Sequence, residues 1–220
     1  MVKIKVEDLK SWKKLSCLTS VLGGLFFIII TIIAMLFYPG GYSFFYDYFS
    51  TLGASKSLNT HEPNPVSSVL FTIACVVVGI SLIPFWIVVT TLFKAKSITK
   101  YLSYIGSIIG FISSPSLIGV GIFPTDTASL EHLISSRFFF LSFATAIMIY
   151  SIAIILNDAY QKMYAFVGFG FSIFIVLFVF RVFALINPLA QKIIVYGFVA
   201  WAFLQIEKIW KNLNSYNLIK

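Results

Sequence analysis

The sequence predicts an all-α integral membrane protein in which residues 1–220 form a single domain, a six-transmembrane-helix bundle with both termini cytoplasmic. Of its residues, 59% are hydrophobic and 11% are charged, whereas soluble domains average roughly 45–50% and about 25%. Six apolar runs are long enough to cross a bilayer, which takes about 20 helical residues. No polar stretch between the runs is long enough to fold separately.

The first two spans have clear boundaries. The first, about 15–38, follows a basic segment, yet it is longer than the roughly 7–15 apolar residues of a signal peptide and has no small-residue cleavage site. We therefore expect an uncleaved helix that ends at Pro39-Gly40-Gly41. The second span, about 65–93, begins with a proline at an early helical position and is expected to kink at Pro84.

The third span, about 101–123, carries Gly106 and Gly110 four residues apart, with several serines nearby. Small residues at this spacing let membrane helices approach closely, so we interpret this face as a packing surface. The remaining spans are separated by short turns and cover about 136–156, 163–185 and 191–210.

The basic residues set the orientation, because cytoplasmic loops carry an excess of Lys and Arg. With the N-terminus inside, the outer set is Lys56, Arg137, Arg181 and Lys192. The inner set is larger: Lys3, Lys5, Lys10, Lys13, Lys14, Lys94, Lys96, Lys100, Lys162, Lys208, Lys211 and Lys220. This distribution also explains the net charge of +8 without nucleic acid as a partner.

Polar residues gather on the predicted outer side, above all in the segment 119–137. It holds Asp126, Glu131, His132 and Arg137. Arg181 lies in an apolar stretch, and an ionisable group in such a place marks a candidate functional site. We expect Arg181 to face the bundle and to pair with a carboxylate, either Asp126 or Asp47 of the first outer loop.

Several alternatives remain open for these residues. Asp126 could cap the helix that carries His132, or the two side chains could share a site. Lys56, Glu62, Lys192 and Glu131 are expected to be solvated. The histidines and carboxylates could bind zinc only through His61 and His132 with Asp126 or Asp47. No zinc-binding spacing supports this set, and Cys17 and Cys75 lie inside apolar runs, so no metal or cofactor is predicted.

A family resemblance rests on short motifs. Phe49–Gly53 (FSTLG), then Asn64-Pro65, then Gly121-x-Phe123-Pro124-x-Asp126 with His132 resemble the prokaryotic membrane family called domain of unknown function 998. That family is in turn distantly similar to the damage-regulated autophagy modulator and FGF-receptor-activating-protein group. The resemblance singles out Ser50, Gly53, Asn64, Asp126 and His132, and it implies a lipid-related role on the outer side.

These observations predict a multi-pass protein of the plasma membrane with membrane lipids as partners. We expect an outer-face pocket that binds a lipid headgroup or similar polar ligand through Asp47, Ser50, Asn64 and Arg181. One alternative is a lipid-modifying hydrolase or transferase, with His132 as general base and Asp126 orienting it; Ser50 could serve as nucleophile, but no GxSxG elbow is present. A small transporter is a further alternative, although no repeat between the two halves is visible.

Overall fold

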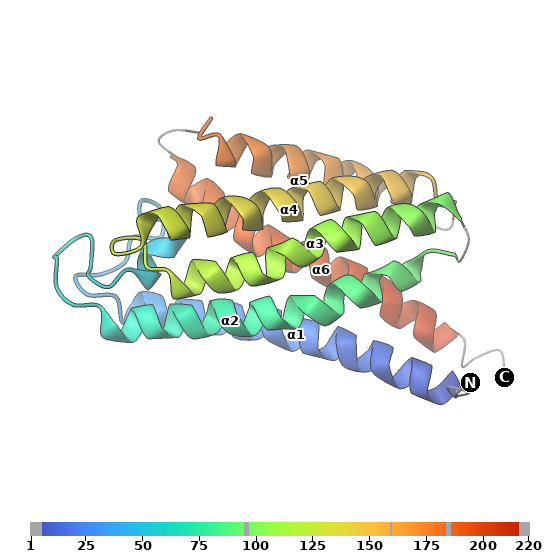
Figure 1. The fold of residues 1–220 in the computed structure, drawn as a ribbon, viewed down its shortest axis with the longest axis horizontal. Coiled ribbons are helices and arrows are strands. Elements are labelled where there is room, and N and C mark those ends of the chain that lie inside the picture. The colour runs from blue at the N-terminus through green and yellow to red at the C-terminus, as the bar shows by residue number, and fades with distance from the viewer. Residues whose placement is uncertain (1–5, 95–96, 159, 184–185, 216–220) are drawn as a thin grey trace.

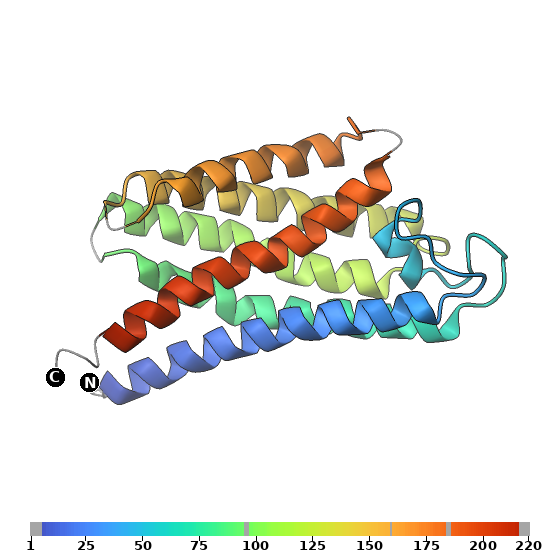
Figure 2. The same ribbon diagram turned by 180° about the vertical axis from the view of Figure 1, so that it is seen from behind.

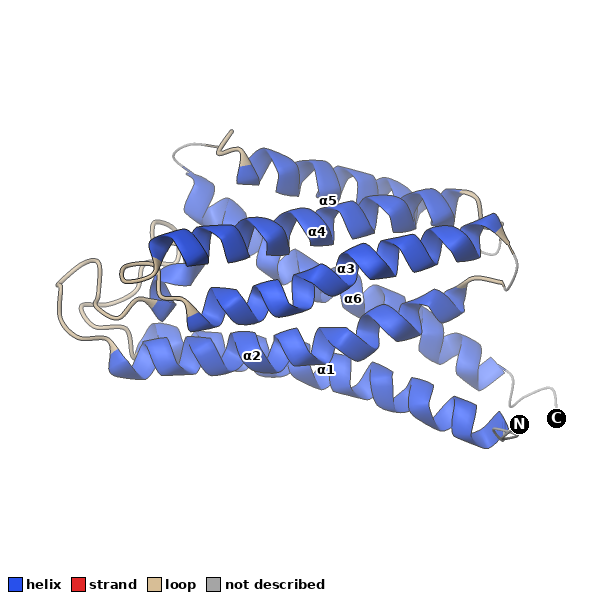
Figure 3. Ribbon diagram, in the orientation of Figure 1, coloured by secondary structure: helices blue, strands red, loops and turns tan. Residues whose placement is uncertain are grey.

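The computed structural model describes residues 6–94, 97–158, 160–183 and 186–215. Within these ranges it contains six α-helices and no β-strand (Figure 3). The helices are α1 (Val6–Leu36), α2 (Pro65–Val88), α3 (Ile98–Ile122), α4 (Ser129–Ile155), α5 (Met163–Val179) and α6 (Asn187–Ser215), with short 3₁₀ helices η1 (Phe49–Gly53) and η2 (Val89–Leu92). Five of the α-helices are long and apolar enough to cross a membrane. The predicted class, a helical multi-pass membrane protein, is confirmed.

The first five helices form a row in which consecutive helices lie antiparallel and side by side (Figure 1). The last helix, α6, runs obliquely across this row and contacts both α1 and α5 (Figure 2). The start of α1 and the end of α6 lie at the same end of the bundle (Figure 1). The opposite end, called the loop end below, carries the long α1–α2 connection with η1 and the α3–α4 connection.

Local sequence explains several helix boundaries. Pro65 starts α2 at its first helical position, as predicted, where a missing N–H costs nothing. The hydroxyl of Ser97 caps α3 by accepting a hydrogen bond from the Lys100 amide at 3.2 Å. Gly40 and Gly41 follow α1 with φ values of 76° and 84°, a backbone conformation that glycine adopts without steric cost.

The predicted packing face on α3 is confirmed. A Cβ on Gly106 would lie 3.0 Å from the ring of Tyr150, and one on Gly110 would lie 2.5 Å from the fully buried indole of Trp86. The serines of this face hydrogen-bond across the helices. Ser107 Oγ lies 2.6 Å from Tyr150 Oη and donates to the Trp86 carbonyl oxygen at 2.5 Å. This face therefore joins α2, α3 and α4.

Two helices differ in extent from the predicted membrane spans. Helix α4 begins at Ser129, so the helix that carries His132 includes polar turns that precede the apolar span predicted from about 136. Helix α5 ends at Val179, 17 residues after its start, and not at 185; residues 184–185 lie outside the described ranges. Four lysines of the basic segments also lie outside the described ranges: Lys3, Lys5, Lys96 and Lys220.

Candidate functional site

A groove of about 690 Å³ opens at the loop end of the bundle. It is built where η1, the first turns of α4, the end of α5 and the start of α6 meet. Its lining residues are Tyr48, Ser50, Thr51, Leu58, Thr125, Ser129, His132, Leu133, Ser136, Arg137, Phe140, Phe178, Val179, Phe180, Arg181, Asn187 and Gln191. Most of these side chains carry hydrogen-bonding groups, so the groove can hold a polar ligand.

The charged side chains that line the groove are positive. Arg137 from α4 and Arg181 from the end of α5 both line it, and no Asp or Glu among the described residues does. Both arginines are exposed, and neither forms a salt bridge among the described residues. Two guanidinium groups without a carboxylate partner favour an anion, because planar N–H donors pair well with phosphate or carboxylate oxygens.

The backbone at Arg181 ends α5 in a specific way. The Arg181 amide donates to the Phe178 carbonyl at 2.9 Å, and the Val182 amide donates to Leu177 at 3.0 Å. These two bonds form a Schellman motif, in which the residue after the cap adopts the left-handed conformation that glycine usually supplies. Arg181 has a φ of 57°, which costs a non-glycine residue about 1–3 kcal/mol. An arginine at a strained position beside a groove is a candidate functional residue.

The predicted partners of Arg181 lie elsewhere. Asp47 Oδ2 accepts a hydrogen bond from the Ser43 amide at 2.7 Å, and Asp126 binds Ser55 of the α1–α2 connection. Neither carboxylate lines the groove. The prediction that Arg181 pairs with one of them inside the bundle was wrong, because α5 ends before Arg181 and leaves its side chain at the groove.

His132 is buried in the first turns of α4, with 8% of its surface exposed, and it lines the groove. Its Nδ1 lies 2.8 Å from the carbonyl oxygen of Phe123. Because a carbonyl oxygen can only accept, Nδ1 must carry the proton, and in the neutral ring Nε2 then carries the lone pair. The Phe123 carbonyl, and not Asp126, orients the imidazole, so the predicted His132–Asp126 pair is absent from this site.

Asp126 instead clasps the two loops of the loop end together. Its carboxylate accepts hydrogen bonds from the Ser55 amide at 3.0 Å, the Ser55 hydroxyl at 2.6 Å and the Lys56 amide at 3.1 Å. Burial alone would raise the pKa of Asp126, but these bonds from Ser55 and Lys56 outweigh it and hold the pKa below its usual value. Asp126 does not cap α4, whose N-cap residue is Ala128 without a side-chain cap.

Removing the charge of this clasp should loosen the loop. In an Asp126→Asn variant we expect hydrogen exchange at the Ser55 and Lys56 amides to accelerate about tenfold or more, because a hydrogen bond to a charged group contributes about 1.5–3 kcal/mol. Exchange measured by mass spectrometry on the purified protein tests this. In Glu131→Gln, which neutralises an exposed acid outside the clasp, exchange should stay unchanged; equal exchange in both variants would contradict the clasp.

The same clasp predicts a pH dependence. Because the folded pKa of Asp126 lies below its unfolded value, the carboxylate contributes stability above that unfolded pKa, which is about 4. This contribution is lost as the pH falls through the folded pKa. Protection of the Ser55 amide should therefore be constant from neutral pH to about pH 5 and decrease below about pH 4.

The other predicted ligand-binding residues have different positions. Ser50 lines the groove, whereas Asn64 does not. Asn64 is fully buried, and its Nδ2 donates to the carbonyls of Leu52 and Ala54 at 3.0 Å each. It therefore holds η1 against the start of α2. Its side chain supports the wall of the groove from behind and is not available to a ligand.

Lys192 was expected to be solvated, and this was wrong. It is fully buried near the start of α6. Its Nζ donates to the carbonyl oxygens of Asp47 and Pro188, and it lies 5.3 Å from the ring centres of Tyr42 and Phe44. The long, flexible side chain of lysine lets its ammonium group reach backbone carbonyls of a neighbouring loop. A hydropathy pattern does not indicate such a contact, so the burial of Lys192 could not be predicted from it. Lys192 ties the α1–α2 connection to α6.

Sequence reasoning missed two polar residues of the groove, Asn187 and Gln191, which lie one turn apart on α6. Gln191 Oε1 accepts a hydrogen bond from the Phe49 amide at 2.6 Å, and Asn187 Nδ2 donates to Tyr48 Oη at 3.3 Å. Within the described part of the chain, the Asn187 Oδ1 and Thr125 Oγ1 atoms are buried without a partner. The sequence did contain one indication, because two amide side chains four positions apart lie on the same face of a helix.

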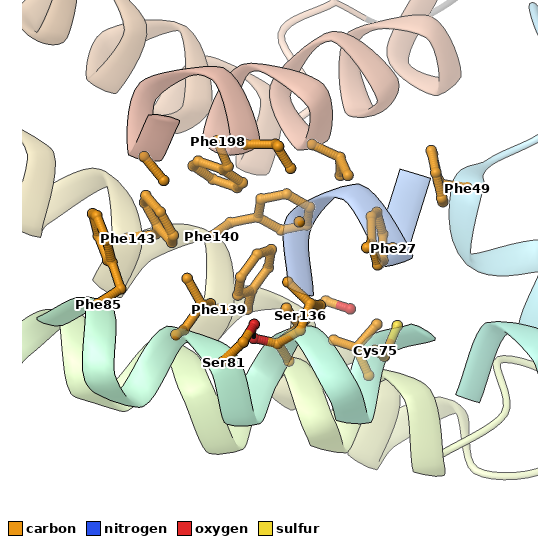
Figure 4. A pocket seen from close by; sticks show the side chains of 18 of the residues that line it. Phe27, Phe49, Cys75, Ser81, Phe85, Ser136, Phe139, Phe140, Phe143 and Phe198 are labelled. Atoms are coloured by element: carbon orange, nitrogen blue, oxygen red, sulfur yellow. Dashed lines mark hydrogen bonds between the residues drawn. The ribbon is translucent and has the colours of Figure 1, made fainter. Parts of the chain in front are cut away.

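A second, inner cavity of about 70 Å³ lies behind the groove, between α6 and the row of helices (Figure 4). We call it the chamber. Phenylalanine rings project into it from several helices, among them Phe27, Phe139, Phe140, Phe143 and Phe198 (Figure 4). The chamber is almost entirely apolar. Across the described ranges, no three His, Cys, Asp or Glu side chains are grouped as metal ligands.

The fold and the groove define a multi-pass helical membrane protein with a basic, polar recess at the loop end. The family described as "Protein of unknown function (DUF998)" matches residues 21–205, so the chain belongs to this family. The predicted resemblance to the domain of unknown function 998 family is therefore confirmed. Searches of the curated proteins and of the solved structures give no match. The more distant similarity to the autophagy-modulator group remains a prediction.

Proposed function

We propose that the groove binds the phosphate headgroup of an anionic membrane lipid. The observation that carries this proposal is the presence of Arg137 and Arg181 on a groove that, in the part of the chain that the structure describes, no carboxylate lines. Hydroxyl and amide groups of Ser50, Asn187 and Gln191 line the same groove and would bind ester or hydroxyl oxygens of the headgroup. A groove at the end of a membrane helix bundle is also where a lipid headgroup is found.

The binding function has better support than the catalytic alternative. A lipid-modifying hydrolase was expected to use His132 as a base oriented by Asp126. Asp126 is occupied by Ser55 and Lys56, and the imidazole is held by the Phe123 carbonyl. A backbone carbonyl fixes the tautomer of a histidine but adds no negative charge to stabilise an imidazolium. His132 then serves the groove as a neutral hydrogen-bonding group.

The direct test of binding uses soluble short-chain lipids. We would titrate the purified protein in a zwitterionic detergent with dihexanoyl phosphatidylglycerol and, separately, with dihexanoyl phosphatidylcholine. The proposal expects saturable binding of the anionic lipid, weakening as salt is added because exposed charges are screened. Equal binding of both lipids, without salt dependence, would refute it.

We also propose a topology in which the loop end faces outward across the plasma membrane. All six helices then cross the bilayer and both termini are cytoplasmic, in line with the excess of Lys near the other end. Helix α5, with 17 residues, is about 25 Å long at 1.5 Å per residue. The bilayer can thin slightly to accommodate a helix of this length.

Cysteine labelling tests this topology in intact cells. Both native cysteines are buried, so they should not react. Thr127→Cys, in the exposed α3–α4 loop, should react with a membrane-impermeant maleimide added outside. Lys94→Cys, exposed at the opposite end, should react only after the cells are permeabilised. The reverse pattern would place the groove in the cytoplasm.

A further inference from the structure

We infer that the headgroup bound in the groove carries hydroxyl groups in addition to its phosphate, and that Asn187 and Thr125 bind these hydroxyls. This inference rests on the proposed headgroup site and names its ligand class, a phosphodiester of glycerol or of another small polyol. Arginines recognise the phosphate, which all anionic phospholipids share, so they do not distinguish one such headgroup from another. Selection among these headgroups then depends on the neutral polar side chains of the groove.

Asn187 offers the groove a hydrogen-bond acceptor. Its side chain is 3% exposed and lines the groove from the start of α6. The Nδ2 atom donates to Tyr48 Oη at 3.3 Å, which engages the nitrogen end of the amide. The Oδ1 atom is buried and has no hydrogen-bond partner within the described ranges. An amide oxygen can only accept, so the group that pairs with it must bring its own proton.

Thr125 offers a second unpaired atom, from the α3–α4 connection. Its side chain lines the groove, and its Oγ1 is buried without a partner among the residues that the structure describes. Buried polar atoms are nearly always hydrogen-bonded in proteins. In the described chain four side-chain atoms depart from this rule, and the other two, Asn64 Oδ1 and Ser114 Oγ, belong to residues that do not line the groove. Two of the four therefore belong to one groove, where a single ligand can pair with both.

A phosphate group alone does not complete these contacts. The oxygens of an ionised phosphodiester are acceptors and have no proton to donate. Beside Asn187 Oδ1 such an oxygen would face another acceptor. A hydroxyl group instead donates to Asn187 Oδ1, and it can either donate to Thr125 Oγ1 or accept from it. The unpaired atoms therefore fit a headgroup in which hydroxyls accompany the phosphate.

The charge of the groove favours a hydroxyl over an ammonium group as the donor. An ammonium group, as in an ethanolamine headgroup, would enter a groove that Arg137 and Arg181 line and that no carboxylate of the described residues lines. Like charges in one site repel each other, whereas a hydroxyl is neutral and donates without this cost. His132, with its proton on Nδ1, adds a neutral side chain with an acceptor nitrogen to the same lining.

The groove has room for a polyol. Its volume of about 690 Å³ falls within the roughly 300–1,000 Å³ of sites that hold whole small molecules. A lone phosphate would leave most of this space to water. Asn187 lies on α6 and Thr125 on the α3–α4 connection, so a headgroup with several hydroxyls can pair with both walls at once.

Two lipids of equal charge test the inference. Dihexanoyl phosphatidylglycerol and dihexanoyl phosphatidylmethanol are both phosphodiesters with one negative charge, and only the first has hydroxyls on its headgroup. We would titrate each into the purified full-length protein in a zwitterionic detergent at the same salt concentration. Phosphatidylglycerol should bind at least about fivefold more tightly, which is the effect of one net hydrogen bond. Equal affinities would overturn the inference, because water would then satisfy the two side chains as well as the ligand does.

Substitutions that remove the unpaired atoms should remove this preference. Asn187→Leu keeps the approximate size of the side chain and deletes its acceptor, so the two lipids should then bind within about twofold of each other. Thr125→Val deletes only a hydroxyl that has no partner within the described ranges, so the fold should stay intact while the preference falls. Ser114→Ala deletes a buried unpaired hydroxyl away from the groove and should leave the preference unchanged. A preference that survives both Asn187→Leu and Thr125→Val would contradict the assignment.

The same titrations separate this inference from the proposed function. Saturable, salt-dependent binding of both lipids with equal affinity would refute the hydroxyl contacts and leave the phosphate site intact. If neither lipid binds in this way, the headgroup site fails and the hydroxyl inference fails with it. Tighter binding of phosphatidylglycerol that is lost in Asn187→Leu supports both.

Discussion

Replacing Arg137 and Arg181 together by glutamine should weaken the binding of dihexanoyl phosphatidylglycerol on the order of 100-fold. A hydrogen bond to a charged group contributes about 1.5–3 kcal/mol, and the exposure of both arginines places each near the lower limit. Two such contributions of about 1.5 kcal/mol correspond to roughly two factors of ten. The titration described above measures the dissociation constants, and the slope against salt should fall as well.

The matched comparison uses single substitutions. Arg181→Gln alone should lose about tenfold in affinity, whereas Lys56→Gln, an exposed cation at the same end that does not line the groove, should stay within about twofold. Neither arginine is buried, so the thermal unfolding midpoint should be the same in all these variants. Equal losses for Lys56→Gln and Arg181→Gln would show that only the general charge of the surface matters.

The largest effect on stability is expected at Gly110. A Cβ added there would lie 2.5–2.6 Å from three atoms of the Trp86 indole, and Trp86 is fully buried, so the ring has no free space to move into. Overpacking of this kind costs about 1–3 kcal/mol. For a chain of this length, a loss of 1 kcal/mol lowers the midpoint by about 2–4 °C, so Gly110→Ala should unfold several degrees earlier, and Gly110→Val earlier still.

Gly170 provides the control for this measurement. It lies within helix α5 and would place its Cβ with no atom within 4 Å. Gly170→Ala should therefore keep or slightly raise the midpoint, because alanine is favoured over glycine in a helix by about 0.8–1.0 kcal/mol. If Gly110→Ala is as stable as Gly170→Ala, the contact between α2 and α3 is looser than the structure indicates.

The sequence predicted the parts of the fold that depend on local patterns. Pro65 marked the start of α2, and the glycines 106 and 110 marked the packing face of α3, because spacing along one helix directly sets which side chains share a face. The end of α5 was missed because it depends on a left-handed residue at Arg181, and arginine carries no signal for that conformation. A glycine at position 181 would have indicated the end of the helix.

The candidate site was predicted only in part, for a different reason. Three of the residues singled out from the sequence line the groove: Ser50, His132 and Arg181. Arg181 stands out because it interrupts an apolar stretch, His132 because it lies in the polar segment 119–137, and Ser50 because it belongs to the family motif. The partner of Asp126 was not found, since Ser55 lies 71 positions away and only the meeting of two loops brings them together. The chamber depends on the crossing of α6 over the other helices, and no single segment of sequence contains that information.

The most direct measurement is an experimental structure of the protein with dihexanoyl phosphatidylglycerol bound. We predict that the phosphate lies in the groove within about 2.7–2.9 Å of guanidinium nitrogens of both Arg137 and Arg181, the range of a charge-assisted N–H···O bond. A phosphate bound elsewhere on the surface, with only solvent between the two arginines, would contradict the account.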